Sequence, residues 1–421
     1  MWFTMRFPDA GGTKVIYFDN AATGKPKNSV SSQICAYIST KDRWGNPSSL
    51  YDLTGDGFSI KKFLYDKRSV VANAIGCKPE EIIFTSGGSE SDNMAIKGVV
   101  FASDKPKKHI ITSKIEHKAV LKSCEFLEKY GLAEVTYLNV NSLGIINLDE
   151  LKNAIREDTV LVSIMTINNE VGSVQPIKEI SEILKPYNIP FHTDAVQAAG
   201  RMRLYVDELG IDLMSISGHK IGTPKGIGIL YKREGIQIEP LIHGGSQEFG
   251  LRAGTENIPY ICGMSAAMEN INNEENFQRI KELSYKFIHD MDTLCGLGKG
   301  VRVIGRPTNE TGIIAVAFKG IKADVLREIM AENGIYVSVG SACNAGQTEL
   351  SHVMKAIDTD EDWAENFIRV SLSADNSESE IQRFWEIAFF VLQYHGDAKN
   401  VKKSIQKNDR LKEIQEQKKM Q

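Results

Sequence analysis

Residues 215–220 read Ser215-Ile216-Ser217-Gly218-His219-Lys220, and a lysine in this position is unusual. The apolar run Ile211–Ile216 predicts a buried strand, and glycines follow it at 222, 226 and 228. Lysine normally sits where its ammonium is hydrated. A lysine held in a pocket can instead lose its proton and act as an amine nucleophile or form a Schiff base. A surface turn with a solvated lysine explains the hexapeptide equally well, so the rest of the chain must decide.

The overall composition is that of an ordinary globular protein. The chain has 421 residues, 42% hydrophobic and 25% charged, which is enough for a large domain plus a smaller one. Its formal net charge of -4 implies no broad nucleic-acid or membrane surface. No apolar run approaches the roughly 20 residues of a membrane span, and the first eight residues lack the apolar core of a signal peptide.

Six cysteines lie at 35, 77, 124, 262, 295 and 343, and none of them forms a C-x-x-C pair. This spacing predicts neither a disulfide framework nor a zinc site, so we expect no metal and a reducing cytoplasm. Cys35 and Cys124 fall in helical patterns with apolar neighbours, which predicts packing. Cys343 stands among small residues in Gly340–Gln347. A working thiol needs exposure and mobility, and we predict one here rather than a buried structural cysteine.

Short β-branched runs alternate with longer helical patterns between about residues 60 and 235. This alternation predicts an α/β fold with a mostly parallel sheet covered by helices on both faces. The predicted strands are Glu81–Thr85, His109–Thr112, Glu134–Leu138, Val160–Ile167, Pro190–His192, Leu213–Ser217 and Ile227–Tyr231, and Ile177–Tyr187 is a predicted helix.

Uncommon polar groups follow five of these strands. In an open α/β sheet, ligands bind just beyond the carboxyl ends of the strands, so we expect the five groups to converge on one pocket. They are Thr85–Ser91, Glu116–Lys118, Asn168–Glu170, Asp194 with Gln197, and His219–Lys220.

Each group can be given a chemical task beside Lys220, and each has a plainer explanation. Gly87-Gly88-Ser89 opens a predicted helix, where N–H groups bind a phosphate or Ser simply caps the helix. His117 could stack on a flat ring or be an ordinary surface histidine. Asp194 could hold a protonated pyridine nitrogen, which makes the ring an electron sink, or cap the next helix. Asn169 and Gln197 could bind a ring hydroxyl or satisfy their own loops.

From Pro240 onward the pattern changes. The helical region Ile258–Leu294 predicts a bridge to a second domain with strands over Gly312–Phe318 and Ile335–Val339. Arg369 lies in the strand-like run Ile368–Leu372, where it could clamp a substrate carboxylate or be exposed to solvent.

The tail from Lys399 to Gln421 carries eight Lys/Arg and three Asp/Glu. With so few apolar residues it is predicted to be a solvated helix or disordered, and docking to an acidic partner is the less favoured interpretation.

Taken together, these groups resemble those of a pyridoxal-phosphate-dependent cysteine desulfurase of the NifS/IscS-like type, within the class V aminotransferase family. The resemblance runs from about Ile16 to Leu372. The motifs, in chain order, are Tyr17–Thr23, Gly45–Ser49, Thr85–Asn93, Glu116–Lys118, Asn168–Glu170, His192–Gln197, Ser217–Lys220, Leu251–Thr255, Gly340–Cys343 and Arg369–Leu372. Three positions depart from the family: Tyr51 replaces a usual His, Gly88-Ser89 a common Ala-Thr, and Glu349-Leu350-Ser351 a common Glu-Pro-Ser.

The resemblance implies the type I fold of pyridoxal-phosphate transferases, with a seven-stranded sheet in the large domain and a smaller α+β C-terminal domain. It places the large domain at residues 16–259. Residues 1–15 and 260–398 would form the small domain with the cysteine loop, and residues 399–421 the basic tail.

The resemblance also implies a homodimer that converts L-cysteine to L-alanine. Its sulfur would pass as a persulfide to an acceptor protein, such as an Fe–S scaffold or a tRNA-thiolation enzyme. The implied catalytic residues are Lys220, Cys343 and His117. The implied pyridoxal phosphate contacts are Gly88, Ser89, His117, Asn169, Asp194, Gln197, Ser217, His219, Lys220 and, from the other subunit, Thr255. Asn46 and Arg369 would hold the substrate carboxylate.

Two other functions stay open at this point. One is a selenocysteine lyase or another class V lyase or aminotransferase. The other is a non-catalytic scaffold with the same fold, and the presence of both Lys220 and Cys343 argues against it.

Overall fold

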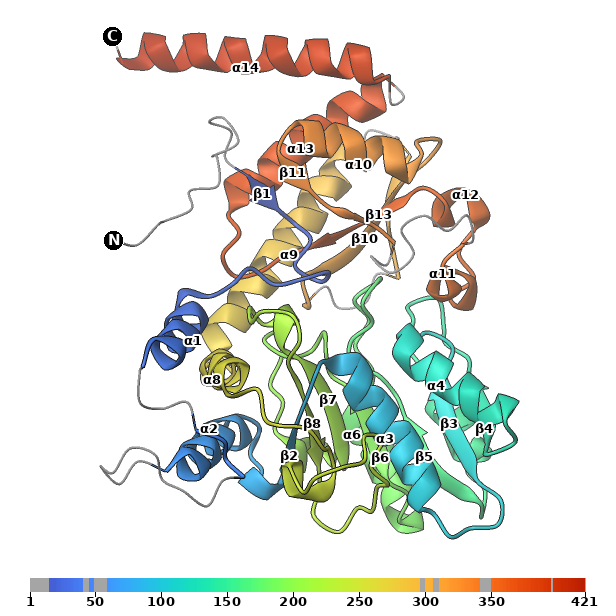
Figure 1. The fold of residues 1–421 in the computed structure, drawn as a ribbon. Helices are drawn as coiled ribbons and strands as arrows, with labels where there is room; N and C mark the ends of the chain where they lie inside the picture. Colours follow the sequence, from blue (N-terminus) through green and yellow to red (C-terminus); the bar gives the residue numbers. More distant parts are fainter. Residues whose placement is uncertain are drawn as a thin grey trace.

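The computed structural model describes residues 15–40, 45–48, 59–295, 300–305, 310–340, 350–394 and 397–420. These residues form a seven-stranded sheet, a four-stranded sheet and a small two-stranded sheet. Figure 1 shows the seven-stranded sheet with its helices in the lower half and the four-stranded sheet in the upper half. Helix α9 (Glu274–Cys295) runs from the lower half to the upper one, as the predicted bridge requires.

The larger sheet has the strand order β2-β8-β7-β6-β5-β3-β4. All its pairings are parallel except those of β8, which is antiparallel to both neighbours. The mostly parallel seven-stranded sheet is thus confirmed. Its strands are β2 (Ile82–Thr85), β3 (His109–Ser113), β4 (Glu134–Leu138), β5 (Thr159–Ser163), β6 (Phe191–Asp194), β7 (Leu213–Ser217) and β8 (Gly228–Lys232). The strand predicted over Val160–Ile167 ends earlier, because residues beyond it turn back through a bridge between Ile167 and Val174.

Both faces of this sheet are buried, because successive side chains of a strand point to opposite sides. In β7, for example, Met214 and Ile216 pack in one core cluster and Leu213 in the other. The helices that accompany the sheet are α2 (Ile60–Ile75), α3 (Gly88–Ala102), α4 (Lys118–Lys129), α5 (Leu148–Ala154), α6 (Ile177–Leu184), α7 (Val206–Leu209) and α8 (Ile258–Met268). No helix among these or the other described residues is long and apolar enough to cross a bilayer.

The C-terminal part is an α+β arrangement around an antiparallel sheet of order β12-β13-β10-β9. Its core joins aromatic side chains of α9 and α13, such as Phe287, Phe384 and Trp385. The elements are β9 (Val301–Ile304), β10 (Ile313–Phe318), α10 (Ala323–Glu332), β11 (Ile335–Tyr336), β12 (Ser338–Val339), α11 (His352–Ala356), α12 (Glu361–Ala364), β13 (Phe367–Ser371), α13 (Glu378–Gln393) and α14 (Ala398–Met420).

The N-terminal strand belongs to this second core, unlike the predicted boundary at residue 16. Strand β1 (Ile16–Tyr17) pairs in parallel with β11, and Phe18 packs with Phe384. The run predicted as one strand over Ile335–Val339 is in fact split between two sheets. The remaining division into domains stays a prediction.

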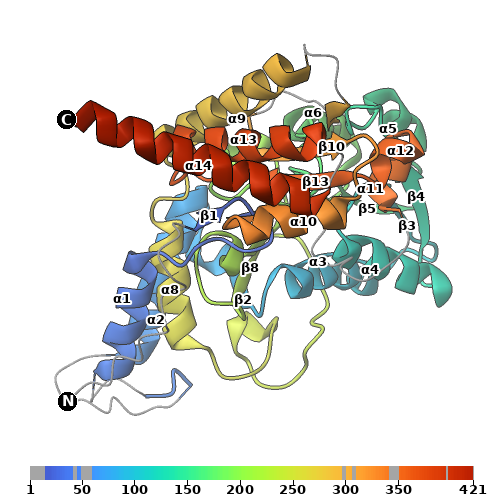
Figure 2. The same ribbon diagram turned by 90° about the horizontal axis from the view of Figure 1, so that it is seen from above.

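The tail is helical over α14, on the side of α13 away from the seven-stranded sheet (Figures 1 and 2). Its first turns are not simply solvated, because Val401 and Ile405 are buried in the second core and Arg383 of α13 pairs with Asp409.

The prediction that Cys35 is packed was wrong. Helix α1 (Asn28–Ser39) buries Val30 and Ile34, which are one turn apart and face α8, whereas the next residue, Cys35, is exposed. Cys124 and Cys262 are buried.

A buried ion pair fixes the loop that follows β8 beside strand β2. Arg68 donates two hydrogen bonds to Glu248, at 2.6 and 2.7 Å, and their side chains are only 5% and 3% exposed. Glu248 also accepts the backbone N–H of Phe84.

We expect Arg68→Ala to lower the free energy of unfolding by about 3–5 kcal/mol, because it leaves Glu248 as an uncompensated buried charge. Urea unfolding of the variant measures this loss. Lys78→Ala is the control, since it removes an ion pair with Glu234 whose side chains are 66% and 73% exposed, and its effect should be far smaller. Equal effects of the two substitutions would contradict the importance of this buried pair.

Candidate active site

A cavity of about 240 Å³ lies at the carboxyl ends of β5, β6 and β7 and brings together the polar groups expected there. The structure therefore confirms their convergence. The predicted residues that line it are Gly88, Ser89, His117, Asn169, Asp194, Gln197, Ser217, His219, Lys220 and Arg369.

Lys220 extends from a short turn, Gly218–Lys220, that directly follows β7. Its Nζ donates hydrogen bonds to the carbonyl oxygens of Ala21 and Ala22, at 2.6 and 2.9 Å. The side chain is half-buried rather than fully solvated. The amine therefore stands at the wall of the cavity, which excludes the surface-turn interpretation.

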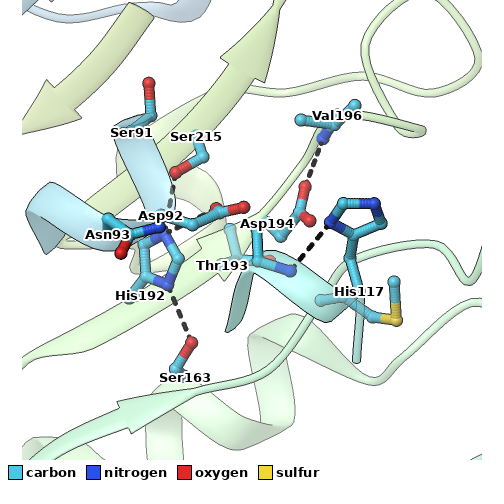
Figure 3. Close-up of polar contacts among 12 residues, drawn as sticks. Ser91, Asp92, Asn93, His117, Ser163, His192, Thr193, Asp194, Val196 and Ser215 are labelled. Carbon is cyan, nitrogen blue, oxygen red and sulfur yellow. Dashed lines mark hydrogen bonds and ion pairs between the residues drawn. The ribbon is translucent and has the colours of Figure 1, made fainter. Parts of the chain in front are cut away.

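Asp194 and His117 lie opposite each other, and their backbone surroundings fix both side chains (Figure 3). Asp194 is 5% exposed and accepts the N–H of Val196 at 2.9 Å. His117 caps α4, with its Nδ1 accepting the N–H of Ala119 at 3.2 Å. The sequence did not predict that His117 caps a helix, and within the described range 59–295 no helix directly follows Asp194, whose carboxylate instead closes a local turn with Val196.

The surroundings of the Asp194 carboxyl affect its pKa in opposite directions. Its burial raises the pKa, while the nearby charges of His117 and Lys220 act in the opposite direction. A cationic group entering the cavity would stabilise the carboxylate further. Gln197, on the same side, donates its Nε2 to the carbonyl of Ala21 at 2.9 Å.

The start of α3 forms one wall of the cavity, and this wall is suited to bind an anion. A Cβ added to Gly88 would meet Val196 Cγ2 at 2.7 Å, so the start of α3 packs closely against this side chain. Ser89 and Ser217 present hydroxyls nearby, and the N–H groups at a helix start favour negative charge.

His219 completes this wall as a neutral ring. Its Nδ1 lies 3.2 Å from Thr23 Oγ1. Burial, and then the charges of Lys220 and Lys225, lower the pKa of His219 to about 4. The imidazole is therefore uncharged at neutral pH and can use a ring N–H as a hydrogen-bond donor.

Arg369 comes from β13 of the other sheet and is 1% exposed, so the alternative of an exposed strand arginine is excluded. It pairs with Asp19 at 2.9 Å and donates to the backbone carbonyl of Asn169 at 2.9 Å. Its Nε is buried and has no hydrogen-bond partner among the described residues. The guanidinium therefore lines the cavity with one donor that no described residue satisfies.

Two predicted residues do not line this cavity. Asn46 is exposed, and its side chain accepts the N–H of Ser48. Thr255 is exposed as well, and its expected contact belongs to a second subunit. Cys343 and Tyr51 lie outside the described residues. The roles inferred for all four stay predictions.

Residues on both sides of the segment 341–349 nevertheless contact the neighbourhood of the cavity. Before it, Ser338 pairs in register with Arg369. After it, Ser351 donates to Glu170 at 2.5 Å, and His352 bonds the carbonyl of Glu116 at 2.9 Å. The described residues that flank positions 341–349 in the chain therefore lie close to His117, Asn169 and Arg369.

Sequence reasoning missed some of the lining residues, including Ala21, Ala22, Met165, Val196 and Asp92. Asp92 could have been found, because it lies four residues after Gly88 on α3 and hence on the same helix face. Ala21 and Ala22 reach the cavity only through long-range packing.

Comparison with known proteins agrees with this geometry. The family model of class-V aminotransferases matches residues 16–384. The cysteine desulfurase IscS of Methanosarcina thermophila is 43% identical over 383 residues, covering 90% of this chain and 92% of the relative. A NifS-like protein of known structure has a TM-score of 0.80 at 35% identity, covering 90% of this chain and all of its own. A structure of SspA in complex with cysteine has a TM-score of 0.73 at 36% identity, and the match covers 86% of this chain and 100% of the SspA chain.

The chain therefore belongs to the class-V aminotransferase family and, within it, to the cysteine desulfurases. This class of enzyme generally depends on pyridoxal phosphate.

Proposed function

We propose that this protein uses pyridoxal phosphate to convert L-cysteine to L-alanine and collects the sulfur as a persulfide on Cys343. The observation that carries the proposal is the convergence of the Lys220 amine, the Asp194 carboxyl and the Arg369 guanidinium in one cavity. The IscS relative and the cysteine-bound SspA structure support the choice of substrate.

The residues of the cavity fit this cofactor in three independent ways. Gly88 and Ser89 offer the N–H groups of a helix start, and Ser217 and His219 offer uncharged side-chain donors, for a phosphate. Asp194 offers a buried carboxyl for a ring N–H, and Lys220 an amine for covalent attachment.

His117 would stack on the cofactor ring, with Asn169 and Gln197 on its hydroxyl side. When bound, the cofactor supplies an electron sink for the charge left on the substrate α-carbon. Arg369 would hold the substrate carboxylate through its guanidinium, together with Asn46. Lys220 would hold the cofactor covalently and would also serve as the base that takes the substrate α-proton.

Cys343 supplies the nucleophile in this scheme. Its thiolate sulfur forms a bond to the substrate sulfur as the carbon–sulfur bond of the substrate breaks, and the carbon fragment leaves as alanine after protonation. Only the thiolate can attack, and a free cysteine has a pKa of about 8.5. The anchoring of residues 338 and 351–352 beside the cavity supports this role.

The scheme extends to partners and location. A sulfur-acceptor protein, such as an Fe–S scaffold or a tRNA-thiolation enzyme, would take the persulfide sulfur. A homodimer would bring Thr255 to the cofactor phosphate of the other subunit, in keeping with its exposure here. The described cysteines 35, 77, 124 and 262 are free thiols, which suits the cytoplasm.

Turnover of two substrates tests the proposed activity. The purified protein loaded with pyridoxal phosphate should release alanine from L-cysteine in the presence of a reductant, together with sulfide. Faster turnover of L-selenocysteine with negligible turnover of L-cysteine would instead identify a selenocysteine lyase. Failure to turn over either amino acid would overturn the proposal.

Asp194→Ala should retain some cofactor and lose activity by about 100-fold or more, because the ring nitrogen is no longer held protonated. Alanine formation at saturating cofactor measures the loss. Asp149→Ala is the matched control, since the Asp149 side chain is 83% exposed on α5, and it should behave like the unaltered protein. Near-normal turnover by Asp194→Ala would contradict the assigned contact.

A further inference from the structure

A second carboxyl, Asp92 of α3, lies beside Asp194 and has no assigned role. It lines the cavity and is 1% exposed. A carboxylate oxygen of Asp92, one of Asp194 and a ring nitrogen of His117 all lie within 4.8 Å of one another. Asp92 Oδ1 is buried and has no hydrogen-bond partner among the described residues.

A chain of hydrogen bonds between side chains of β5, β6 and β7 leads to Asp92 on α3 (Figure 3). Ser163 Oγ lies 2.8 Å from His192 Nδ1, and His192 Nε2 lies 3.0 Å from Ser215 Oγ. Ser215 also hydrogen-bonds the Asp92 carboxyl.

The burial of His192 and the hydrogen bond between Ser215 and Asp92 indicate where the protons of this chain lie. Burial lowers the pKa of His192 to about 3, so its ring is neutral and carries one N–H. If Ser215 donates to Asp92, its oxygen accepts that N–H from Nε2, and Ser163 then donates to Nδ1. His192, 3.7 Å from Asp92 Oδ1, thus brings no positive charge to it.

The two neighbouring carboxyls are not equivalent. Two buried carboxylates this close cannot readily both be ionised. Asp194 has the Val196 N–H and the charges of His117 and Lys220 in its favour. Burial, then the charge of Asp194, raises the pKa of Asp92 well above its usual range, and Glu116 adds to this while only Ser215 opposes it.

We infer that Asp92 is a positioning residue for Asp194: it stays a neutral carboxylic acid, so that the single negative charge at this end of the cavity resides on Asp194. The inference rests on the proposed function for its meaning, because Asp194 is the residue that would hold the cofactor ring nitrogen. If Asp92 were a second carboxylate, it would compete with Asp194 for the proton on the cofactor ring nitrogen.

The pH dependence of stability in the absence of cofactor tests the protonation directly. A carboxyl whose folded pKa is raised contributes stability that is present below its unfolded pKa of about 3.9 and is lost as the pH rises toward the folded value. Because asparagine does not titrate, Asp92→Asn removes this pH-dependent loss of stability. The melting temperature of Asp92→Asn relative to the unaltered protein should therefore rise by at least about 2 °C between pH 5 and pH 7.

The other titratable groups that act on Asp92 or line the cavity with it include Asp194, Glu116, His117, His192, His219 and Lys220, and both proteins retain them. A difference in melting temperature that is the same at the two pH values would overturn the inference. Infrared difference spectra between the two proteins at pH 7 provide a second measurement. They should show the C=O band of a protonated carboxylic acid, and a carboxylate band in its place would also overturn the inference.

Cofactor affinity tests the consequence for Asp194. Asp92→Ala should weaken pyridoxal phosphate binding by about tenfold, because Ser215 loses its acceptor, and Asp92→Asn should restore it to within about threefold. A loss in Asp92→Asn as large as that in Asp194→Asn would mean that Asp92 carries the charge. The melting and infrared measurements need no cofactor, so they distinguish failure of this inference from failure of the proposed function.

Discussion

Lys220→Ala is expected to lose the covalently bound cofactor and at least about 1,000-fold in alanine formation. General base catalysis alone contributes about 100- to 10,000-fold, and Lys220 would supply both the base and the attachment point. Its Nζ already stands at the cavity wall, held by two backbone carbonyls. Borohydride reduction followed by peptide mapping should place a pyridoxyl group on Lys220 of the unaltered protein and on no residue of the variant.

Lys225→Ala is the matched control for this experiment. Lys225 lies five residues further along the same segment and is exposed, so its removal should leave both the label and the activity in place. A pyridoxyl group found on any lysine other than Lys220 would show that the attachment site has been misidentified.

Cys343→Ser should still bind pyridoxal phosphate and L-cysteine, because Lys220 and the residues around the cavity are unchanged. It should lose alanine formation by about 100-fold or more, since a hydroxyl is a far poorer nucleophile toward sulfur than a thiolate. The cofactor absorbance band on addition of L-cysteine measures binding, and alanine release measures sulfur removal.

Cys35→Ser provides the control for that loss. Cys35 is an exposed thiol on α1 and does not line the cavity, so the variant should release alanine at the normal rate. Alanine release by Cys343→Ser at the rate of Cys35→Ser would rule out Cys343 as the sulfur acceptor.

Much of the fold and the cavity could be predicted because their determinants are local. The apolar run before Lys220 sets β7, and the alternation of such runs sets a parallel sheet. Parallel strands place their carboxyl ends at one edge, so the positions of His117, Asp194 and Lys220 in the chain sufficed to bring them together.

The features that were missed depend on contacts between distant segments. Strand β1 has only two residues, and its pairing with β11 leaves no periodic signal in the sequence. Arg369 of β13 donates from Nη1 to the carbonyl of Asn169, a contact between distant segments that the sequence does not indicate. Cys35 was misjudged because an apolar neighbourhood in sequence does not show which face of a helix is buried.

The central claim is that sulfur from L-cysteine is transferred to Cys343. The most direct measurement is peptide mass spectrometry after brief incubation of the cofactor-loaded protein with L-cysteine in the absence of reductant. Our account predicts one additional sulfur on the peptide that contains Cys343, formed together with one alanine per subunit. Additional sulfur on another cysteine, or alanine released with no persulfide on the protein, would contradict it.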